Sequence, residues 1–204
     1  MTDFLYSLDV WVFRWINGGW SCPAWDKFFS FITDIHHFYP ALLVLAFFLL
    51  WKGGAKGRWM VLALIVTVIL TDQISAHVLK NLVGRVRPCN ALTGVLTPVG
   101  PSSSHSFPSS HATNMGGSML LLSLAYPAYA WFFGLWALAV GLSRIYLGLH
   151  YPSDVLGGYL LGMAIGGGIW GALCRWVPAF QAPKKKADSP PRRGRRGHSK
   201  GRPK

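Results

Sequence analysis

The sequence predicts an all-α integral membrane protein, a helical bundle with a single core. Apolar residues make up 51% of its 204 residues and only 13% are charged, well below the roughly 25% of a soluble domain. The chain has seven Asp and no Glu. These proportions argue against a disordered chain, a coiled coil and an ordinary soluble enzyme. Five segments are apolar over nearly the length that a bilayer requires; they are 37–51, 59–82, 112–127, 129–147 and 153–175.

The N-terminal region adds two shorter helices, and the sequence leaves their relation to the membrane open. Residues 4–17 are amphipathic and end at Asn17-Gly18-Gly19, and a second short helix is expected over 24–34. They either lie at the membrane interface or supply a further span, so the bundle has five to six transmembrane helices. The chain divides into an N-terminal part, a transmembrane domain and a basic tail, with the bounds 1–36, 37–178 and 179–204.

Most of the net charge of +13 belongs to the tail. Residues 182–204 hold ten Lys or Arg against one Asp, whereas residues 1–181 hold ten against six. A segment of Pro, Gly and basic residues cannot bury a core, so we expect a disordered tail. Attraction to anionic lipid headgroups is a further interpretation. Because no aromatic residue is interleaved with these charges, nucleic-acid binding is not expected.

Basic residues at the ends of the spans predict the orientation of the bundle, because cytoplasmic loops are rich in Lys and Arg. Lys52, Lys56 and Arg58 lie between the first two spans, and Arg175 and the tail follow the last. Both places are therefore expected in the cytoplasm. The connections after the second and fourth spans then face the other side. We expect a multi-pass protein of the inner (plasma) membrane, with an extracytoplasmic active-site loop and a cytoplasmic C-terminal tail.

The first polar cluster lies at the end of the second span. Lys80 and Arg87 are seven residues apart, which on a helix is about 10 Å along nearly the same face. Pro88 then ends the helix. Two cations on one face can clamp an anion. The alternative is that both side chains extend to lipid headgroups.

The second cluster opens the third span. Ser109, Ser110 and His111 follow Pro108 and a polar stretch. Small hydroxyl residues at a helix start leave backbone N–H groups free, and such helix starts bind phosphate. His111 can give or take a proton there. The alternative is a plain Ser cap with an incidental His.

The third cluster connects the fourth and fifth spans. Arg144 ends the fourth span, and Asp154 lies four residues after His150, within reach of a ring N–H. A His oriented by a carboxylate is the base or nucleophile of a catalytic triad. The alternative is a structural hydrogen bond between the two side chains.

All three clusters fall on the same predicted face of the membrane. Together they supply three cations, hydroxyls at a helix start and two histidines. No set of carboxylates, His or Cys suited to a metal accompanies them, so we expect no metal and no cofactor. The combination fits phosphoryl transfer in which Lys and Arg provide the charge clamp.

These clusters resemble the signature motifs of the type 2 phosphatidic acid phosphatase family, which includes membrane lipid phosphatases and soluble vanadium haloperoxidases. One position departs from the family pattern, because Ser110 stands where Gly is usual. Its N–H can still reach a phosphate oxygen, and its side chain is expected to tighten the pocket or change which headgroup fits. The matching motifs are Lys80-x6-Arg87-Pro88, Pro108-Ser109-Ser110-His111 and Ser143-Arg144-x5-His150-x3-Asp154.

The resemblance implies a role for each residue. His150 attacks phosphorus and becomes a phosphohistidine, while Asp154 fixes its tautomer. His111 protonates the leaving oxygen and then activates water. The residues alone indicate the anion clamp and the His–Asp pair, but not which His is the nucleophile. The residues implied to hold the non-bridging oxygens are Lys80, Arg87, Ser109, Ser110 and Arg144.

The leading interpretation is therefore a metal-independent lipid phosphatase of the outer face. Its substrate is a lipid phosphate or diphosphate. The candidates are undecaprenyl diphosphate, a glycerolipid phosphate such as phosphatidic acid or phosphatidylglycerophosphate, and lipid A phosphate. A small chain with an outward-facing site favours undecaprenyl diphosphate. A lipid phosphotransferase would use the same phosphohistidine. Less favoured are a vanadium haloperoxidase-like enzyme and a non-catalytic membrane scaffold. Oligomeric state stays open, as does the role of Asp72 inside the second span, for which pairing with Arg144 or a polar neighbour is the first interpretation.

Overall fold

The computed structural model describes residues 2–181, which form helices and connecting loops without a strand. The tail from residue 182 onwards, for which we expect disorder, lies outside the described residues. The α-helices are α1 (Thr2–Asn17), α2 (Pro23–Thr33), α3 (Tyr39–Lys52), α4 (Gly54–Asp72), α5 (Lys80–Val83), α6 (Pro88–Ala91), α7 (Ser110–Ala125), α8 (Ala130–Tyr146) and α9 (Pro152–Trp176). Shorter elements are the 3-10 turns η1 (Ile35–Phe38), η3 (Pro127–Tyr129) and η4 (Pro178–Phe180) and the π-helix η2 (Gln73–Leu79).

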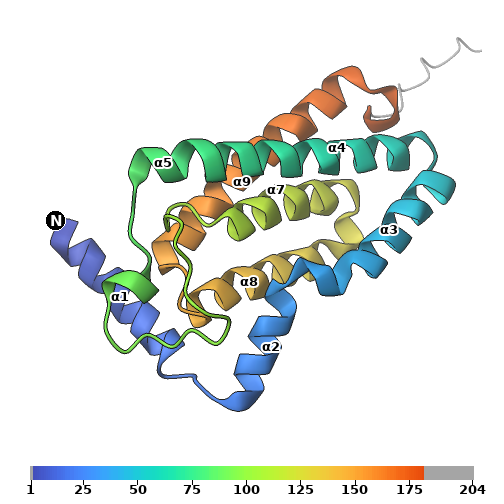
Figure 1. Cartoon of the computed structure of the whole chain (residues 1–204). Helices are drawn as coiled ribbons and strands as arrows, with labels where there is room; N and C mark the ends of the chain where they lie inside the picture. Colours follow the sequence, from blue (N-terminus) through green and yellow to red (C-terminus); the bar gives the residue numbers. More distant parts are fainter. Residues whose placement is uncertain (1, 182–204) are drawn as a thin grey trace, which may run out of the picture.

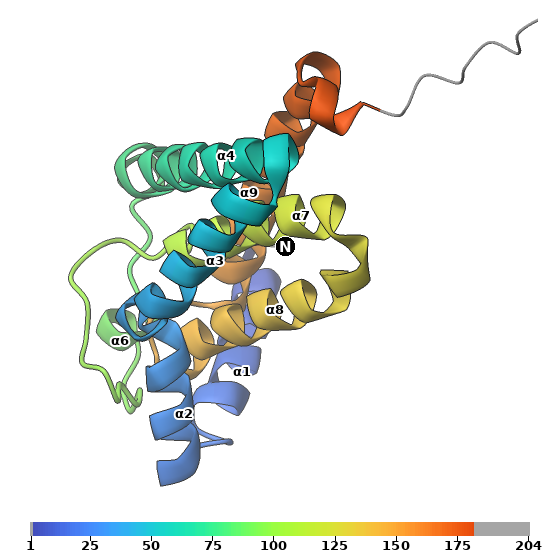
Figure 2. The same cartoon turned by 90° about the vertical axis from the view of Figure 1, so that its right-hand side faces the viewer.

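Each of the five apolar segments forms a helix, so the expected all-α membrane bundle is confirmed. Helix α7 lies between α4 and α8 and also packs on α9 (Figures 1 and 2). It has only 16 residues, and half of them are buried. Which helices cross the membrane stays a prediction. The segments of residues 2–181 that are long and apolar enough to cross are Ile35–Lys52, Gly54–Ala91, Pro127–Tyr146 and Pro152–Trp176.

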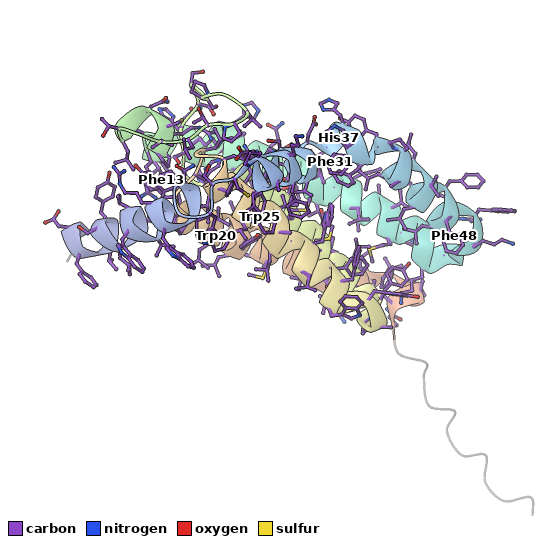
Figure 3. All side chains as sticks on the ribbon, turned by 90° about the horizontal axis from the view of Figure 1, so that it is seen from below. Phe13, Trp20, Trp25, Phe31, His37 and Phe48 are labelled. Atoms are coloured by element: carbon purple, nitrogen blue, oxygen red, sulfur yellow. The ribbon has the colours of Figure 1, made fainter. Side chains whose placement is uncertain are left out.

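Helix α3 presents apolar side chains outwards along most of its length. Leu43, Val44 and Phe47 each expose more than 60% of their surface, and of the residues of α3 only Leu49 is buried. Figure 3 shows Phe48 pointing away from the bundle. So much exposed apolar surface on one helix is expected where lipid, rather than water, surrounds it.

Three glycines of α9 allow it to pack closely on α7. A Cβ at Gly158 would lie 2.7 Å from the carbonyl oxygen of Ser109, and one at Gly166 would lie 2.6 Å from that of Gly117. A Cβ at Gly162 would likewise meet the backbone of α7. Small residues spaced by four let two helix backbones approach in a membrane. Gly158, Gly162 and Gly166 thus form a glycine stripe along α9 that is used for packing within the chain.

The π-helix η2 changes which face of the second apolar segment points inwards. Buried positions in α4 and η2 include Ala63, Thr67, Thr71 and Ser75, which recur every four residues. Regular α-helical spacing would next bury position 78 or 79. The wider π turn instead brings Lys80 to the buried face, with 9% of its surface exposed. Single π turns occur inside α-helices at functional sites, and this one directs Lys80 into the bundle.

The two expected N-terminal helices are α1 and α2, and both pack against α8. Phe13 and Ile16 of α1 and Phe29 of α2 join one core cluster with Tyr146. The side chain of Asn17 donates to the carbonyl of Tyr146 at 2.7 Å. Neither helix is among the membrane-crossing candidates of the described residues, so a position at the interface remains our expectation for them.

Candidate active site

The three sequence clusters meet at one end of the bundle. Lys80 begins α5, Arg87 precedes α6, His111 lies in the first turn of α7, Arg144 lies in the last turn of α8, and His150 is in the turn before α9. The side chain of Arg87 donates to His150, and the N–H of Ser109 donates to the carbonyl of Asp154, so the three clusters are in direct contact. The packing of α7, α8 and α9 therefore gathers residues from five separate places in the sequence.

His150 is buried, and its two ring nitrogens face groups of opposite charge. Nε2 accepts a hydrogen bond from Nη1 of Arg87 at 3.0 Å. Because a guanidinium cannot accept, Nε2 has no proton and Nδ1 has one. Nδ1 lies 3.7 Å from Oδ2 of Asp154, which is too far for a hydrogen bond, and it has no other partner in the described part of the chain.

These surroundings hold the pKa of His150 well below its ordinary range. Burial is the main cause, because it disfavours the charged ring, and the charges of Arg87 and Arg144 act in the same direction. Asp154 opposes them without reversing the shift. The ring is therefore neutral at neutral pH, and the lone pair of Nε2 accepts the hydrogen bond from Arg87.

Asp154 is fully buried, and its carboxylate is oriented by groups other than His150. Oδ2 accepts from the hydroxyl of Ser106 and from the N–H of Tyr151 at 2.8 Å. Oδ1 accepts from Nη1 of Arg85 at 2.6 Å. The bond from Tyr151 is part of a capping box at the start of α9. The carboxylate is thus fixed with Oδ2 turned towards His150.

Arg87 is held almost rigidly at the site, with 4% of its surface exposed. Its Nε and Nη2 donate to the carbonyl and hydroxyl oxygens of Ser104, each at 2.8 Å. Nη1 donates to the carbonyl of Leu149 at 2.9 Å as well as to His150. The planar guanidinium is therefore positioned beside Nε2 before any substrate binds.

Arg144 is tied to the N-terminal part of the chain. Its Nη1 donates to Oγ1 of Thr33, the last residue of α2, at 2.6 Å. Its Nε is buried without a hydrogen-bond partner among the described residues. Guanidinium groups bind carboxylates and phosphates through several N–H groups at once, and Arg144 retains donor capacity for such an anion.

The start of α7 joins the other clusters through its cap. Oγ of Ser109 accepts from the N–H of Ala112 at 3.5 Å, and the N–H of Ser109 donates to the carbonyl of Asp154 at 3.1 Å. The hydroxyl of Ser110 accepts from that of Ser75 at 3.1 Å. The α7 terminus with its positive dipole end is therefore anchored to η2 and to the start of α9, a position suited to phosphate.

Asp72 lies outside this group of residues. Its Oδ1 accepts from the side-chain amide of Asn114 at 3.0 Å, and the amide oxygen of Asn114 accepts from Thr71 at 2.5 Å. The expected pairing is therefore with a polar neighbour and not with Arg144. This network connects α4 to α7 about one and a half turns beyond the α7 cap.

A cavity of about 620 Å³ opens next to the site. It is lined by α2, η1, residues 99–102, Arg144 and Leu149. His37 stacks on Phe31 beside it, with ring centroids 4.5 Å apart, and Figure 3 shows the two side chains together.

Within residues 2–181, no three His, Cys, Asp or Glu side chains are grouped so as to hold a metal ion.

Sequence reasoning missed five residues that shape the site. Arg85 stands out in the sequence as a positive charge on the predicted outer face, two residues before Arg87, but the sequence gives it no role in the site. Two of the others lie in the polar stretch before α7, where nothing distinguishes one Ser from the next. The last two lie in the N-terminal helices, far from the motifs in sequence. The five are Asp9, Thr33, Arg85, Ser104 and Ser106.

Residues 56–178 match the PAP2 superfamily. Over 174 residues the chain is 32% identical to the lipid A 4′-phosphatase of Bacteroides thetaiotaomicron, covering 79% of this chain and 75% of that protein. It is 31% identical to an undecaprenyl-diphosphatase of Bacillus subtilis over 69% of this chain and 71% of that protein. The crystal structure of the first transmembrane PAP2 type phosphatidylglycerolphosphate phosphatase from Bacillus subtilis matches with a TM-score of 0.64 and 25% identity, covering 82% of this chain and 85% of that chain.

The fold and the site thus define a helical membrane enzyme that acts on phosphate esters. The protein belongs to the PAP2 superfamily, since the match covers more than half of the chain and extends to relatives of similar length. The expected resemblance to type 2 phosphatidic acid phosphatases is confirmed.

Proposed function

We propose that this protein is a membrane lipid phosphatase that hydrolyses a phosphomonoester or diphosphate of a lipid through a phosphohistidine at His150. The observation that carries the proposal is the buried, neutral His150 held between Arg87 and Asp154. His111 lies in the first turn of α7, whose cap residue Ser109 donates to the carbonyl of Asp154. The relatives support the choice of a lipid, because their names specify lipid A, undecaprenyl diphosphate and phosphatidylglycerolphosphate. These molecules differ in headgroup but share a phosphate on a membrane lipid.

In the first step Nε2 of His150 forms a bond to phosphorus, and the bond from phosphorus to the leaving oxygen breaks. The leaving oxygen takes a proton from His111, which must enter this step as the imidazolium. In the free site, burial and the charge of Arg144 hold the pKa of His111 low, so the anionic lipid has to bind together with this proton. The imidazole becomes a cation with phosphate on Nε2 and hydrogen on Nδ1. Asp154, 3.7 Å from Nδ1, stabilises this cation as the ring shifts towards it.

In the second step water replaces the imidazole on phosphorus. His111, now without its proton, accepts one from the water molecule, whose oxygen bonds to phosphorus. The bond from phosphorus to Nε2 breaks, inorganic phosphate leaves, and His150 returns to its neutral form. The same residue thus serves as acid and then as base, which restores the starting state.

The non-bridging oxygens are held by Lys80, Arg87 and Arg144 and by the start of α7 at Ser109 and Ser110. Three buried cations in a site of low polarity stabilise developing negative charge without moving during the reaction. Support comes from the donors already in place, namely the buried Nε of Arg144 and the fixed guanidinium of Arg87. This clamp takes the part that a divalent metal has in other phosphatases, so the reaction needs no metal.

We place the site on the extracytoplasmic face of the inner membrane. Lys52 and Lys56 lie where α3 meets α4, and Arg175 lies near the end of α9, both at the opposite end of the bundle from the loop that precedes α7 (Figure 1). A cytoplasmic position for these basic residues, and for the tail, directs the site outwards. The cavity beside Arg144 is on the water-facing side in this arrangement and receives the lipid headgroup.

The test is phosphate release by the full-length protein in detergent. Phosphatidic acid, phosphatidylglycerophosphate, undecaprenyl diphosphate and lipid A are supplied in turn, with EDTA present throughout. We expect inorganic phosphate from at least one of them, at a rate that EDTA leaves unchanged and that vanadate, as a phosphate mimic, inhibits. His105→Ala is the matched control, because His105 is an exposed histidine of the loop before α7. A strict need for Mg²⁺, or release from none of the four lipids, would contradict the proposal.

A further inference from the structure

Arg85 lies between two buried carboxylates, Asp9 and Asp154, which are far apart in the sequence. Its Nη1 donates to Oδ1 of Asp154, and its Nη2 donates to Oδ2 of Asp9 in α1, both at 2.6 Å. The guanidinium also lies over the ring of Tyr151, 4.1 Å from the centroid. Asp9 and Asp154 expose 8% and 0% of their surfaces. The contact between α1 and the phosphatase bundle therefore includes a charged group that also touches Asp154.

Asp9 is bound to the first turn of α9 as well. Its Oδ1 accepts from the N–H of Ser153 at 2.8 Å, and its Oδ2 accepts from the hydroxyl of the same residue. Ser153 directly precedes Asp154. A carboxylate at a helix N-terminus is favoured by the free N–H groups and by the helix dipole. Asp9 is thus fixed by two independent sets of donors, from α9 and from Arg85.

The net charge of Asp9, Arg85 and Asp154 affects how well Asp154 can stabilise a cationic ring on His150. Asp9, Arg85 and Asp154 together have one net negative charge, because two carboxylates face one guanidinium. Without Asp9, the charge of Arg85 would cancel that of Asp154. Asp154 would then stabilise a cationic ring on His150 less well, because opposite charges at short range in a buried site interact strongly.

We propose that Asp9 and Arg85 are positioning residues for the phosphoryl transfer at His150. Arg85 turns Asp154 so that Oδ2 faces Nδ1 of His150, and Asp9 neutralises Arg85 so that Asp154 retains its negative charge. Neither residue contacts the reacting atoms. Through Asp9, helix α1 becomes part of the catalytic unit and is more than a membrane-surface anchor.

The experiment measures formation of the phosphoenzyme in a single turnover with the full-length protein in detergent. The probe is whichever of the four lipids named above the wild type hydrolyses fastest, with a radiolabelled phosphate. Asp9→Asn removes the charge but retains the shape. Asp26→Asn is the matched control, because Asp26 is also a carboxylate of an N-terminal helix that accepts a bond from the bundle, here from Tyr146 at 2.6 Å, without contacting Arg85.

We expect Asp9→Asn to form the phosphoenzyme about tenfold more slowly or worse, with an unchanged half-saturating lipid concentration. Asp26→Asn should match the wild type in rate. The double variant with Asp9→Asn and Arg85→Gln should be faster than Asp9→Asn alone, because it restores one net negative charge at Asp154. A purely structural contact would instead make the double variant as slow as the worse single variant.

A wild-type rate in Asp9→Asn overturns the inference, and so does a double variant that is no faster than Asp9→Asn. If the variants with Arg85→Gln fail to fold, the comparison of Asp9→Asn with Asp26→Asn decides alone. The inference rests on the proposed function, since it requires His150 to be the nucleophile. The two failures are distinguishable: a phosphoenzyme in His150→Ala refutes the nucleophile itself, whereas an inert His150→Ala beside a fully active Asp9→Asn refutes only the role of Asp9.

Discussion

At the residue scale, the chemistry that we propose is divided between two histidines in different surroundings. His150 is enclosed by Arg87, Asp154 and the packed start of α9, whereas His111 lies in the first turn of α7 near Arg144. The hydrogen bond from Arg87 fixes the tautomer of His150 and leaves Nε2 unprotonated. In the proposed mechanism the nucleophile and the acid are thus the same residue type with different hydrogen-bond partners.

Replacing each histidine should therefore fail at a different step. We expect His150→Ala to form no phosphoenzyme and to release no phosphate. His111→Ala should still bind the lipid but turn it over about 10²- to 10⁴-fold more slowly, because the leaving oxygen receives no proton. Acid quenching after mixing with radiolabelled lipid measures both. Wild-type turnover in His150→Ala would refute the assignment of the nucleophile.

The lowered pKa of His150 also makes the free energy of unfolding depend on pH. An unfolded chain protonates His at about pH 6.5, whereas the folded protein holds the pKa of His150 far lower because the ring is buried beside Arg87 and Arg144. Below about pH 6.5 the unfolded state thus binds a proton that the folded state does not. The stability that neutral His150 contributes is complete above this pH and is lost as the pH falls.

We expect the free energy of unfolding to fall more steeply between about pH 6.5 and 4.5 in the wild type than in His150→Gln. Denaturant titrations in one detergent at constant ionic strength measure it. The comparison with His150→Gln removes the contributions of all other titrating groups. Parallel pH dependences in the two proteins would show that the pKa of His150 is not lowered.

At the scale of elements, the site depends on the contact between α7 and α9. Ser109 begins one helix, Asp154 begins the other, and the N–H of Ser109 donates to the carbonyl of Asp154. This bond forms because Gly158, Gly162 and Gly166 let the two backbones approach. The glycine stripe therefore sets the relative position of two of the three motifs.

A side chain within the stripe should force these helices apart. We expect Gly162→Ala to lower the free energy of unfolding by about 1–3 kcal/mol and to reduce turnover, because the added Cβ meets backbone atoms of Thr113 and Gly117. Gly168→Ala is the control on the same helix, since a Cβ there has no neighbour within 4 Å. It should be neutral or stabilising by up to about 1 kcal/mol. Equal stability of the two variants would contradict the close contact.

At the scale of the whole molecule, the orientation of the bundle in the membrane decides on which side the site lies. The basic ends of α3 and α9 lie at one end and the motifs at the other (Figure 1). Cys89 directly follows Arg87 and Pro88, and Cys174 lies near the end of α9. Both thiols are free and partly exposed, so each can report on one side of the membrane in the orientation that we propose.

We expect a membrane-impermeant thiol reagent to label Cys89 but not Cys174 on intact cells, using variants that retain one cysteine each. Permeabilised cells provide the control, in which both positions should react. This outcome follows from the positive-inside rule applied to Lys52, Lys56 and Arg175. Labelling of Cys174 alone would reverse the orientation and place the site at the cytoplasmic leaflet.

The fold class and the main residues of the candidate site follow from the amino-acid sequence alone. Apolar segments of nearly bilayer length predict helices whatever their neighbours, because lipid leaves the backbone no other partner. The three motifs consist of local residues in fixed spacing, so Lys80, Arg87, His111, Arg144 and His150 are recognisable directly. Their meeting at one end of the bundle is predictable only because span counting places all three on the same face.

The orientation of these residues, and the groups that hold them, depend on the tertiary structure. The π turn that directs Lys80 inwards leaves no mark in the apolar pattern, because one extra residue in a helix preserves its composition. The contacts of Asp9, Thr33 and Ser106 join elements far apart in the sequence. The packing of whole helices determines which of these side chains are in contact. Spacing alone was also wrong in one place: Lys80 and Arg87 do not share a helix face, because α5 ends at Val83 and Pro88 begins α6 instead of ending a helix. The close approach of separate backbones determines which side chains touch.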